Sequence, residues 1–413
     1  MRILLLFVMS LLFSPVFGQE IAQFRGPFRD GIYHDKGLLK KWPAAGPKLE
    51  LQIAGIGKGY SQPIVYKGTI YTTGIKHDTM DVISAYDLKG KLLWEQAYGK
   101  AWPNSFPDTR STPTIQNDKI YLVGGMGIVC CLDAKDGKML WSQDAQNEYK
   151  GEYHKWGIAE SVLLTDKAAI YVTGGEVTSV VAFDKIAGKP LWKTKSLGGL
   201  RAYASSLLIE RNGLQIILAQ TGNDLIGINA INGDILWSFN LIQFHLGESG
   251  KGVNTNTPIY KNGEIFVTSG YDHPAMMFSL SEDGHSVSLK WKNEELDTHH
   301  GGDVLVDGNL YGSNWQSNSK GQWVSVNWKT GKTNWVKDWF NKGSIIAADG
   351  SLYCYEEKGG NVALVQPDVT DFKIISTFKV TAGEGANWAH PAIYDGKLYL
   401  RHGNILLIYN IKA

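Results

Sequence analysis

The sequence predicts an all-β fold, a single eight-bladed β-propeller of four-stranded blades. A phrase that runs from a small residue and Asp or Asn through a turn Gly to Trp recurs along the chain, and six such Trp are 47, 51, 45, 54 and 44 residues apart. A strand with an aromatic or large apolar landmark occurs eight times. The stretch KLELQIA at 48–54 is typical of a strand but belongs to no unit, as expected where an N-terminal strand closes a ring.

The first 18 residues are typical of a secretory signal peptide. Arg2 gives a basic start, residues 3–13 form an apolar core, and residues 16–18 resemble a cleavage site. The apolar run is too short to cross a bilayer. We therefore expect an exported protein, periplasmic or extracellular and soluble once residues 1–18 are removed.

Composition excludes several partner classes. Removal of Arg2 with the signal peptide takes the 41 basic residues to 40, which balance 40 acidic ones. A net charge near zero favours neither nucleic acid nor an anionic membrane as partner. Three cysteines are too few for a disulfide framework. Cys130 and Cys131 are adjacent in a predicted strand, where neighbours point to opposite faces, so we interpret them as ordinary thiols.

The N-terminal extension is expected at residues 19–47, before the propeller at 48–413. Strand 48–54 must run from the bottom face to the top to lead into the first blade, so the extension should enter at the bottom, near the C-terminus. Arg25, Arg29 and Asp30 are expected to bond to that underside.

Each unit carries four strand signals, which in the second unit are STPTIQ, KIYLVGG, IVCCLDA and KMLWSQD. The connection between the first and second strands of a unit is a tight turn such as Asn117-Asp118, a pair that suits positive φ. The connection between the third and fourth strands ends in the Gly that precedes each repeat Trp. The eighth unit lacks a fourth strand, which 48–54 supplies. We expect the repeat tryptophans to pack between blades, since large aromatics bury much area: Trp94, Trp141, Trp192, Trp237, Trp291 and Trp335.

The repeat, as in AFDKIAGKPLW at 182–192, resembles that of pyrroloquinoline-quinone-type (PQQ-like) propellers. That group includes quinoprotein alcohol dehydrogenases and the propeller subunit of the outer-membrane assembly machinery. The segments QFRGPFRDGI at 23–32 and THHGGDVLVDG at 298–308 resemble exported bacterial members. WD40 repeats are disfavoured because the sequence has no Trp-Asp dipeptide, and the Gly-to-Trp spacing disfavours kelch repeats. The resemblance implies the fold, and one fold hosts many functions.

The two faces of the predicted ring differ in chemistry. Bottom gaps are short turns, whereas eight of the ten histidines fall in top connections. Links between units end at the mouth of the channel, where donors, acceptors and aromatics suit a small polar molecule or carbohydrate. We predict His299, His300 and His154 as acid or base residues. The predicted ligand-binding residues are Tyr60, Arg110, Lys155, Trp156, Glu160, Arg201, Tyr203, Asn254, Asn256, Trp315, Trp388 and His390.

Three functions stay open, and so does whether the protein is an enzyme. The first is a top-face site for a small polar or glycan ligand, with or without catalysis. The second is a quinone-dependent dehydrogenase; the resemblance implies a quinone stacked on Trp beside calcium. We disfavour PQQ with calcium because the calcium-ligand set cannot be placed on this chain, and the cofactor and any metal stay unknown. The third is a non-catalytic scaffold that binds proteins through blade loops, like the assembly propeller.

Overall fold

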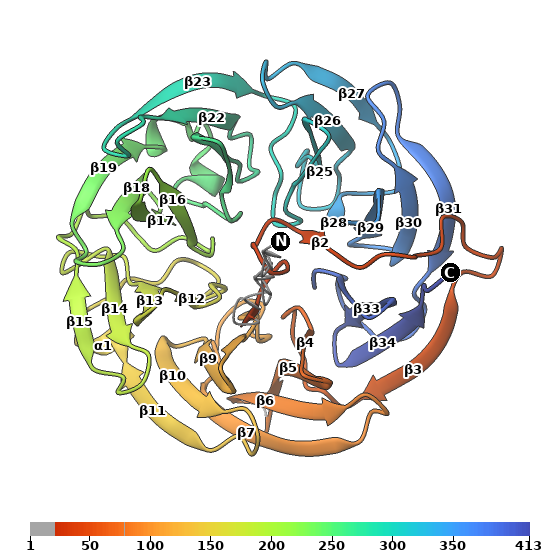
Figure 1. Cartoon of the computed structure of the whole chain (residues 1–413), viewed down its shortest axis with the longest axis horizontal. Helices are drawn as coiled ribbons and strands as arrows, with labels where there is room; N and C mark the ends of the chain where they lie inside the picture. The colour runs from red at the N-terminus through yellow and green to blue at the C-terminus, as the bar shows by residue number, and fades with distance from the viewer. Residues whose placement is uncertain (1–20, 78) are drawn as a thin grey trace, which may run out of the picture.

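The computed structural model describes residues 21–77 and 79–413. The expected signal peptide at 1–18 lies outside the described residues. Eight blades, each of four antiparallel strands, surround a central axis, which confirms the predicted all-β propeller (Figure 1). In this part of the chain, no helix is long and apolar enough to cross a membrane.

The first blade shows the plan of all eight. Its strands follow one another from the axis outward as β4 (Ile64–Tyr66), β5 (Thr69–Lys76), β6 (Met80–Asp87) and β7 (Leu92–Lys100). Each pairs antiparallel with the next, and the β4–β5 turn has Lys67 and Gly68 at positive φ, 46° and 77°. A two-residue turn of this type matches the twist of its strands.

The other blades repeat this order. Blade two contains β8 (Thr114–Gln116), β9 (Lys119–Val123), β10 (Ile128–Asp133) and β11 (Met139–Asp144). Blades three and four contain β12 (Leu163–Leu164), β13 (Ala168–Val172), β14 (Val180–Asp184), β15 (Pro190–Lys193), β16 (Leu207–Arg211), β17 (Leu214–Gln220), β18 (Asp224–Asn229) and β19 (Ile235–Asn240). Blades five and six contain β20 (Ile259–Lys261), β21 (Glu264–Val267), β22 (Ala275–Leu280), β23 (Val287–Asn293), β24 (Val304–Val306), β25 (Asn309–Ser313), β26 (Trp323–Asn327) and β27 (Thr333–Lys337). Blade seven contains β28 (Gly343–Ala348), β29 (Ser351–Glu356), β30 (Asn361–Gln366) and β31 (Lys373–Lys379). Short helices α1 (Ala145–Glu148), η1 (Ile242–Phe244) and η2 (Glu248–Gly250) lie in links between blades.

The eighth blade joins the two ends of the chain. β32 (Ala392–Tyr394), β33 (Lys397–His402) and β34 (Ile405–Asn410) are completed by β3 (Lys48–Ala54), which pairs antiparallel with β34. This confirms closure by an N-terminal strand. Closure gives every outer strand a blade on each side and leaves the ring without a free end.

The core lies between blades, where apolar side chains of adjacent sheets face one another. Ile170 and Ala182 of blade three, for example, join Ile217 and Ile226 of blade four in one buried cluster. Because successive side chains of a strand point to opposite faces of its sheet, each blade contributes side chains to the interfaces with both neighbouring blades. Cys130 and Cys131 follow this rule, since both are buried and free and they belong to the clusters on opposite sides of blade two.

The N-terminal segment occupies the centre of the ring (Figure 1). β1 (Ile21–Ala22) pairs antiparallel with β8, and β2 (Ile32–Tyr33) pairs parallel with β28. The chain therefore climbs along blade two, turns inside the channel and descends along blade seven. We name residues 21–33 the channel segment. Residues beyond it contact bottom turns, as in the hydrogen bond from Leu38 N to Asp349 Oδ2 (3.0 Å).

Two buried arginines fix the turn of the channel segment. Arg29 donates to the carbonyls of Ser161 (3.0 Å), Ser206 (3.1 Å) and Val162 (2.5 Å). Arg25 donates to carbonyls on the opposite side of the ring, including that of Asp303 at 2.5 Å. The sequence predicts that Arg25 and Arg29 bond to the underside of the ring. In the structure both arginines instead lie inside the channel, against inner strands and links of several blades.

Candidate functional site: a pocket on the propeller axis

A pocket of about 250 Å³ opens at the axis on the top face, where the links between blades converge. Every wall residue lies in a connection before an inner strand or in the gap between the second and third strands of a blade. The channel segment supplies one residue from below. The lining consists of Phe24, Tyr60, Phe106, Arg110, Trp156, Ala159, Tyr203, Ser205, Thr255, Tyr271, His299, His300, Asn318, Glu357, Trp388 and His390.

Two groups of aromatic side chains form the walls. Trp388 packs against Tyr60 and Phe106, with ring centroids 4.8 and 5.4 Å away. Across the pocket, Trp156 lies parallel to Tyr271, with an interplanar angle of 14° and centroids 6.2 Å apart. Aromatic faces of this kind present flat, weakly polar surfaces to a ring-shaped ligand.

The floor is built by the channel segment. The ring of Phe24 meets His390 edge to face at 4.9 Å, and Arg25 Nη1 lies 3.0 Å from His390 Nδ1. His390 Nε2 is 2.8 Å from the carbonyl oxygen of His300. The turn of the channel segment is thus bonded to the same loop that carries the paired histidines.

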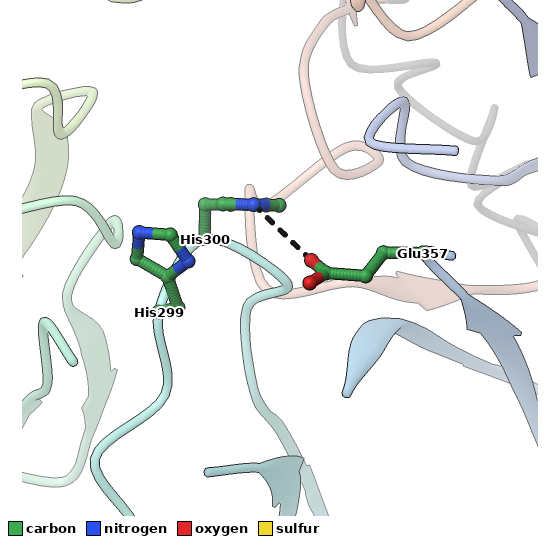
Figure 2. Close-up of side chains that lie close together, drawn as sticks. All are labelled: His299, His300 and Glu357. Carbon is green, nitrogen blue, oxygen red and sulfur yellow. Dashed lines mark ion pairs between the residues drawn. The ribbon is translucent and has the colours of Figure 1, made fainter. Parts of the chain in front are cut away.

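His299, His300 and Glu357 bring three potential ligand atoms within 4.8 Å of one another (Figure 2). His300 Nε2 lies 3.4 Å from Glu357 Oε2, and His299 Nε2 lies 2.9 Å from the Tyr271 hydroxyl. His299 Nδ1 and His300 Nε2 are buried and have no hydrogen-bond partner among the described residues. The two histidines precede β24 of blade six, whereas Glu357 follows β29 of blade seven, so the packing of these adjacent blades brings them together.

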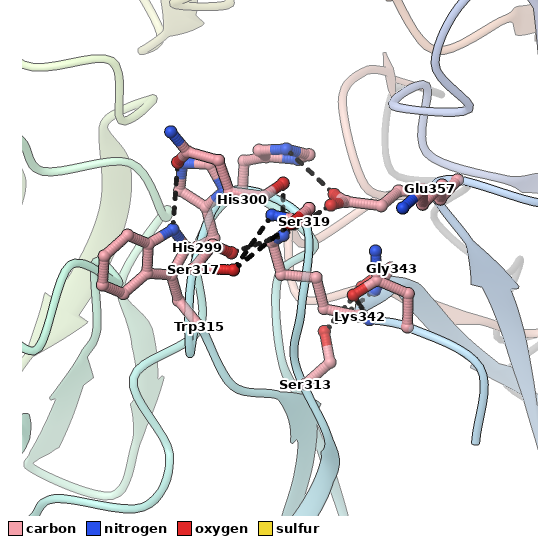
Figure 3. Close-up of polar contacts among 12 residues, drawn as sticks. His299, His300, Ser313, Trp315, Ser317, Ser319, Lys342, Gly343 and Glu357 are labelled. Carbon is pink, nitrogen blue, oxygen red and sulfur yellow. Dashed lines mark hydrogen bonds and ion pairs between the residues drawn. The ribbon is translucent and has the colours of Figure 1, made fainter. Parts of the chain in front are cut away.

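Lys342 holds the carboxylate in place (Figure 3). Its ammonium is 2.6 Å from Glu357 Oε1 and donates to the carbonyls of Ser317 (3.0 Å) and Asn318 (3.1 Å). Lys342 is buried, so this pair is little screened by solvent. One oxygen of Glu357 is therefore occupied and the other faces His300.

Burial sets the protonation of these groups. Burial, and then the neighbouring positive charge of Lys342, lowers the pKa of His300 to about 3. Burial likewise lowers the pKa of His299 and His390 well below the usual value and raises that of Glu357. The histidines are therefore neutral near pH 7, and their nitrogens can act as acceptors or metal ligands.

The structure brings eight of the predicted residues together in the pocket lining. They are Tyr60, Arg110, Trp156, Tyr203, His299, His300, Trp388 and His390. Burial lowers the pKa of Arg110, but a guanidinium keeps its proton in proteins, and that of Arg110 donates to the Phe106 carbonyl. It is the one fully ionised donor of the lining in the described part of the chain.

Glu160 and Arg201 lie outside the lining as a buried ion pair, 2.9 Å apart. Arg201 also donates to the Tyr171 hydroxyl (2.6 Å), and Glu160 accepts from Val172 N. Burial raises the pKa of Glu160 to about 7, although Arg201 and Arg29 oppose that shift. This pair joins blades three and four beneath the pocket and is out of reach of a top-face ligand.

The other predicted residues lie behind the wall or away from it. Asn256 donates to the carbonyls of Thr298 (2.7 Å) and His299 (3.0 Å) and so positions the histidine loop. Asn254 donates to the Thr221 carbonyl, and His154 packs parallel to Trp156. Trp315 packs on Tyr271 at 5.1 Å, and Lys155 is exposed.

Sequence reasoning missed eight lining residues. Tyr271, Asn318 and Glu357 belong to gaps between second and third strands, which face the top as the links do, so the same geometric argument could have included them. Phe24 was missed because the N-terminal segment was expected below the ring. The remaining missed residues are Phe106, Ala159, Ser205 and Thr255.

A family model described as "Outer membrane protein assembly factor BamB" (PQQ_2) matches residues 79–337. The matched stretch runs from the third strand of blade one to the end of blade six and contains much of the pocket wall. The chain belongs to this family. The PQQ-like resemblance of the repeat is thereby confirmed.

Curated relatives share modest identity. The outer membrane protein assembly factor BamB of Kangiella koreensis is 24% identical over 221 residues, 52% of this chain and 50% of the relative. BamB of Yersinia pestis is 22% identical and covers 66% of this chain and 67% of the relative. The quinoprotein alcohol dehydrogenase PedH of Pseudomonas putida is 24% identical, over 46% of this chain and 33% of the relative. The chain spans about half the length of the first curated relatives it matches.

Solved structures show the same fold. BamB from Moraxella catarrhalis aligns with a TM-score of 0.64 and 13% identity, over 88% of this chain and 99% of that one. A europium-containing methanol dehydrogenase aligns with a TM-score of 0.65 and 12% identity, over 91% and 88%. At these identities the likeness concerns the fold alone.

Proposed function

We propose that the axial pocket binds a small polar ligand that contains a ring, such as a sugar or another polyol. The observation that carries this proposal is the pocket itself: aromatic walls, few polar groups and a floor formed by the channel segment. Pockets of this composition, concave and apolar with a few placed donors, are the usual form of small-molecule sites.

The polar groups support the same ligand class. Arg110 offers charged donors beside Trp388 and Tyr60, and Ser205, Thr255 and Asn318 add uncharged ones around the rim. A polyol ring can stack on Trp388 or Trp156 while its hydroxyls bond to these groups. The unpartnered nitrogens of His299 and His300 are neutral and accept a hydrogen bond from such a hydroxyl, but a pKa of about 3 makes His300 a weak base, so the proposal is one of binding.

A calcium-bound quinone does not fit the donor set. Calcium takes six to eight oxygen ligands, whereas the lining has one carboxylate, Glu357, and Lys342 already holds one of its oxygens. The adjacent Cys130 and Cys131 are buried in blade two and do not line the pocket. We therefore rank quinone-dependent oxidation below ligand binding and derive no step through a quinone.

Ligand screening of the mature chain tests the proposal. A panel of sugars and polyols, with pyrroloquinoline quinone plus calcium as a separate arm, is read by thermal shift and then by calorimetry. We expect at least one sugar or polyol to raise the melting temperature and to quench tryptophan fluorescence. Trp388→Ala should abolish both effects. Trp339 lies on the top face but outside the pocket lining, so the control variant Trp339→Ala should keep them.

Two outcomes would overturn this ranking. Stabilisation by the quinone arm alone would favour a dehydrogenase. The absence of any ligand effect, with Trp388→Ala indistinguishable from the parent protein, would favour a scaffold. The protein-binding scaffold is therefore the second candidate function, and membership of the family supports it. Two exposed isoleucines in equivalent bottom turns of neighbouring blades support it as well: Ile186 is 79% exposed and Ile231 is 78% exposed. We also propose an exported location, which the signal-peptide pattern supports.

A further inference from the structure

We propose that His299, His300 and Glu357 form a binding site for a divalent transition-metal ion of the zinc type at one side of the axial pocket. This site goes beyond the proposed polyol site and does not depend on it. The donor set is two imidazole nitrogens and one carboxylate, a combination that binds catalytic zinc in other proteins.

The spacing of the donors carries the inference. His300 Nε2 and Glu357 Oε2 are 3.4 Å apart, and the three potential ligand atoms lie within 4.8 Å. Two ligands that are each about 2.1 Å from a tetrahedral metal are about 3.4 Å apart. The His300–Glu357 separation already suits a shared ion, and His299 requires only a small ring movement.

Unsatisfied nitrogens point to a missing partner. Buried polar side-chain atoms almost always have a hydrogen bond. His299 Nδ1 and His300 Nε2 have none among the described residues, although both belong to one loop beside a carboxylate. A cation between them would satisfy both atoms at once.

The groups around the triad would orient it. His299 Nε2 lies 2.9 Å from the Tyr271 hydroxyl, which leaves Nδ1 as the nitrogen available to a metal. The His299 carbonyl accepts from Thr255 and Asn256, so the backbone of this loop is fixed. Lys342 fixes the carboxylate through its other oxygen, Oε1.

The ligand chemistry selects the ion. Imidazole nitrogens favour zinc, copper, nickel and iron over calcium and magnesium, which prefer oxygen. With one carboxylate beside Lys342, the metal keeps a net positive charge. Three protein ligands also leave a coordination position open toward the pocket, as in catalytic rather than structural zinc sites.

Direct metal titration tests the site. The mature chain without a polyhistidine tag is stripped with a chelator and titrated with Zn²⁺ by calorimetry near pH 7. Co²⁺ is then added to an identical sample, and its visible spectrum reports nitrogen ligation. We expect one equivalent of Zn²⁺ to bind, to displace Co²⁺, and to resist excess Ca²⁺.

Variants locate the ion. His299→Ala, His300→Ala and Glu357→Gln should each weaken Zn²⁺ binding at least about tenfold, and Tyr271→Phe should weaken it by about 10- to 100-fold. The matched control is His285→Ala, which removes a histidine 4.0 Å from Asp283 in a bottom turn and should leave Zn²⁺ binding unchanged.

Metal binding by the unsubstituted chain tests the site even where a substituted protein does not fold. Absence of stoichiometric Zn²⁺ and of a nitrogen-ligated Co²⁺ spectrum in the unsubstituted chain would overturn the inference even if a variant failed to fold. Binding that His299→Ala and His300→Ala leave intact would overturn it too. A polyol that binds the chelator-treated protein would support the proposed function while leaving the metal result separate.

Discussion

At the residue scale, burial decides what each histidine can do. His245 and His273 stack beside the pocket with ring centroids 3.6 Å apart and an interplanar angle of 0°. His245 Nδ1 accepts from Gly252 N (2.9 Å), so this nitrogen carries no proton. Burial lowers the pKa of His245 to about 4, and burial with the neighbouring His245 lowers that of His273 to about 3.

This stacked pair predicts acid sensitivity. Both pKa values are lower in the folded state than the ordinary value of 6.5, so the unfolded chain takes up protons first as pH falls. Their contribution to stability is present above about pH 6.5 and is lost toward pH 4. We expect His245→Gln/His273→Gln to flatten the decline in unfolding free energy from pH 7 to pH 4 by on the order of 2–3 kcal/mol per histidine.

Urea denaturation at a series of pH values measures this decline. The control is His34→Gln at an exposed position, which leaves the stacked pair intact. An identical decline in the double variant and the unsubstituted chain would refute the prediction.

At the element scale, each repeat Trp is matched to a turn in the next blade. Trp141 of β11 lies over Gly188, where an added Cβ would come within 2.6 Å of the indole, and its Nε1 donates to the Lys185 carbonyl (2.9 Å). Trp94 and Gly137 repeat the contact one blade earlier, with a Cβ distance of 2.5 Å. The turn Gly thus serves two purposes, a positive φ and room for the indole.

Gly188→Ala separates these two purposes. The substitution places a side chain at φ 70° and drives Cβ into Trp141, so we expect a loss of about 2–4 kcal/mol in unfolding free energy. Gly308→Ala is the matched control, because Gly308 has φ 77° but nothing within 4 Å of an added Cβ. It should cost about 1–2 kcal/mol. Equal losses in a denaturant titration would show that the Trp contact adds nothing.

At the scale of the whole molecule, the channel segment ties the ring together from inside. Arg29 alone bonds to inner strands or links of three blades, through Thr114, Val162 and Ser206. Burial lowers its pKa only to about 10, so it stays charged. A planar guanidinium offers five donors spread over a rigid fork, whereas a lysine ammonium offers three donors at a single point.

Arg29→Lys should therefore lower the unfolding free energy by about 2–3 kcal/mol, since several buried carbonyls lose their donor. Hydrogen exchange should rise first at residues 21–33. Phe28→Ala, at a side chain that is 64% exposed in the same segment, is the control and should change stability by less than about 0.5 kcal/mol. A stable Arg29→Lys variant with unchanged exchange would show that the segment is not held by this arginine.

Much of the fold could be predicted because its information is local. The spacing of Trp94, Trp141 and Trp192, the turn Gly before each, and the strand landmarks repeat along the chain. A repeated unit that cannot bury its own face must stack on its copies. The orphan strand at 48–54 then specified closure, and β3 pairs with β34 as expected.

The candidate site was predictable only in part. Link residues such as Tyr60 and Trp388 could be assigned to the mouth from topology, and both line the pocket. Tyr60 and Trp388 stand four residues before their inner strands, whereas Glu160 and Arg201 stand three and six residues before theirs and form a buried pair, at a greater depth than the pocket wall. Position in a repeat does not specify that depth.

By itself the sequence determined the repeat, the number of blades, the closing strand and the face that carries the histidines. Only the tertiary structure decided that Glu357 meets His300, that Lys342 holds it, and that Phe24 of the channel segment forms the floor. The physical reason is the range of the interactions. Strand and turn signals act within one unit, whereas the site is made by loops of different blades and by an N-terminal segment, which approach one another only when the ring has closed.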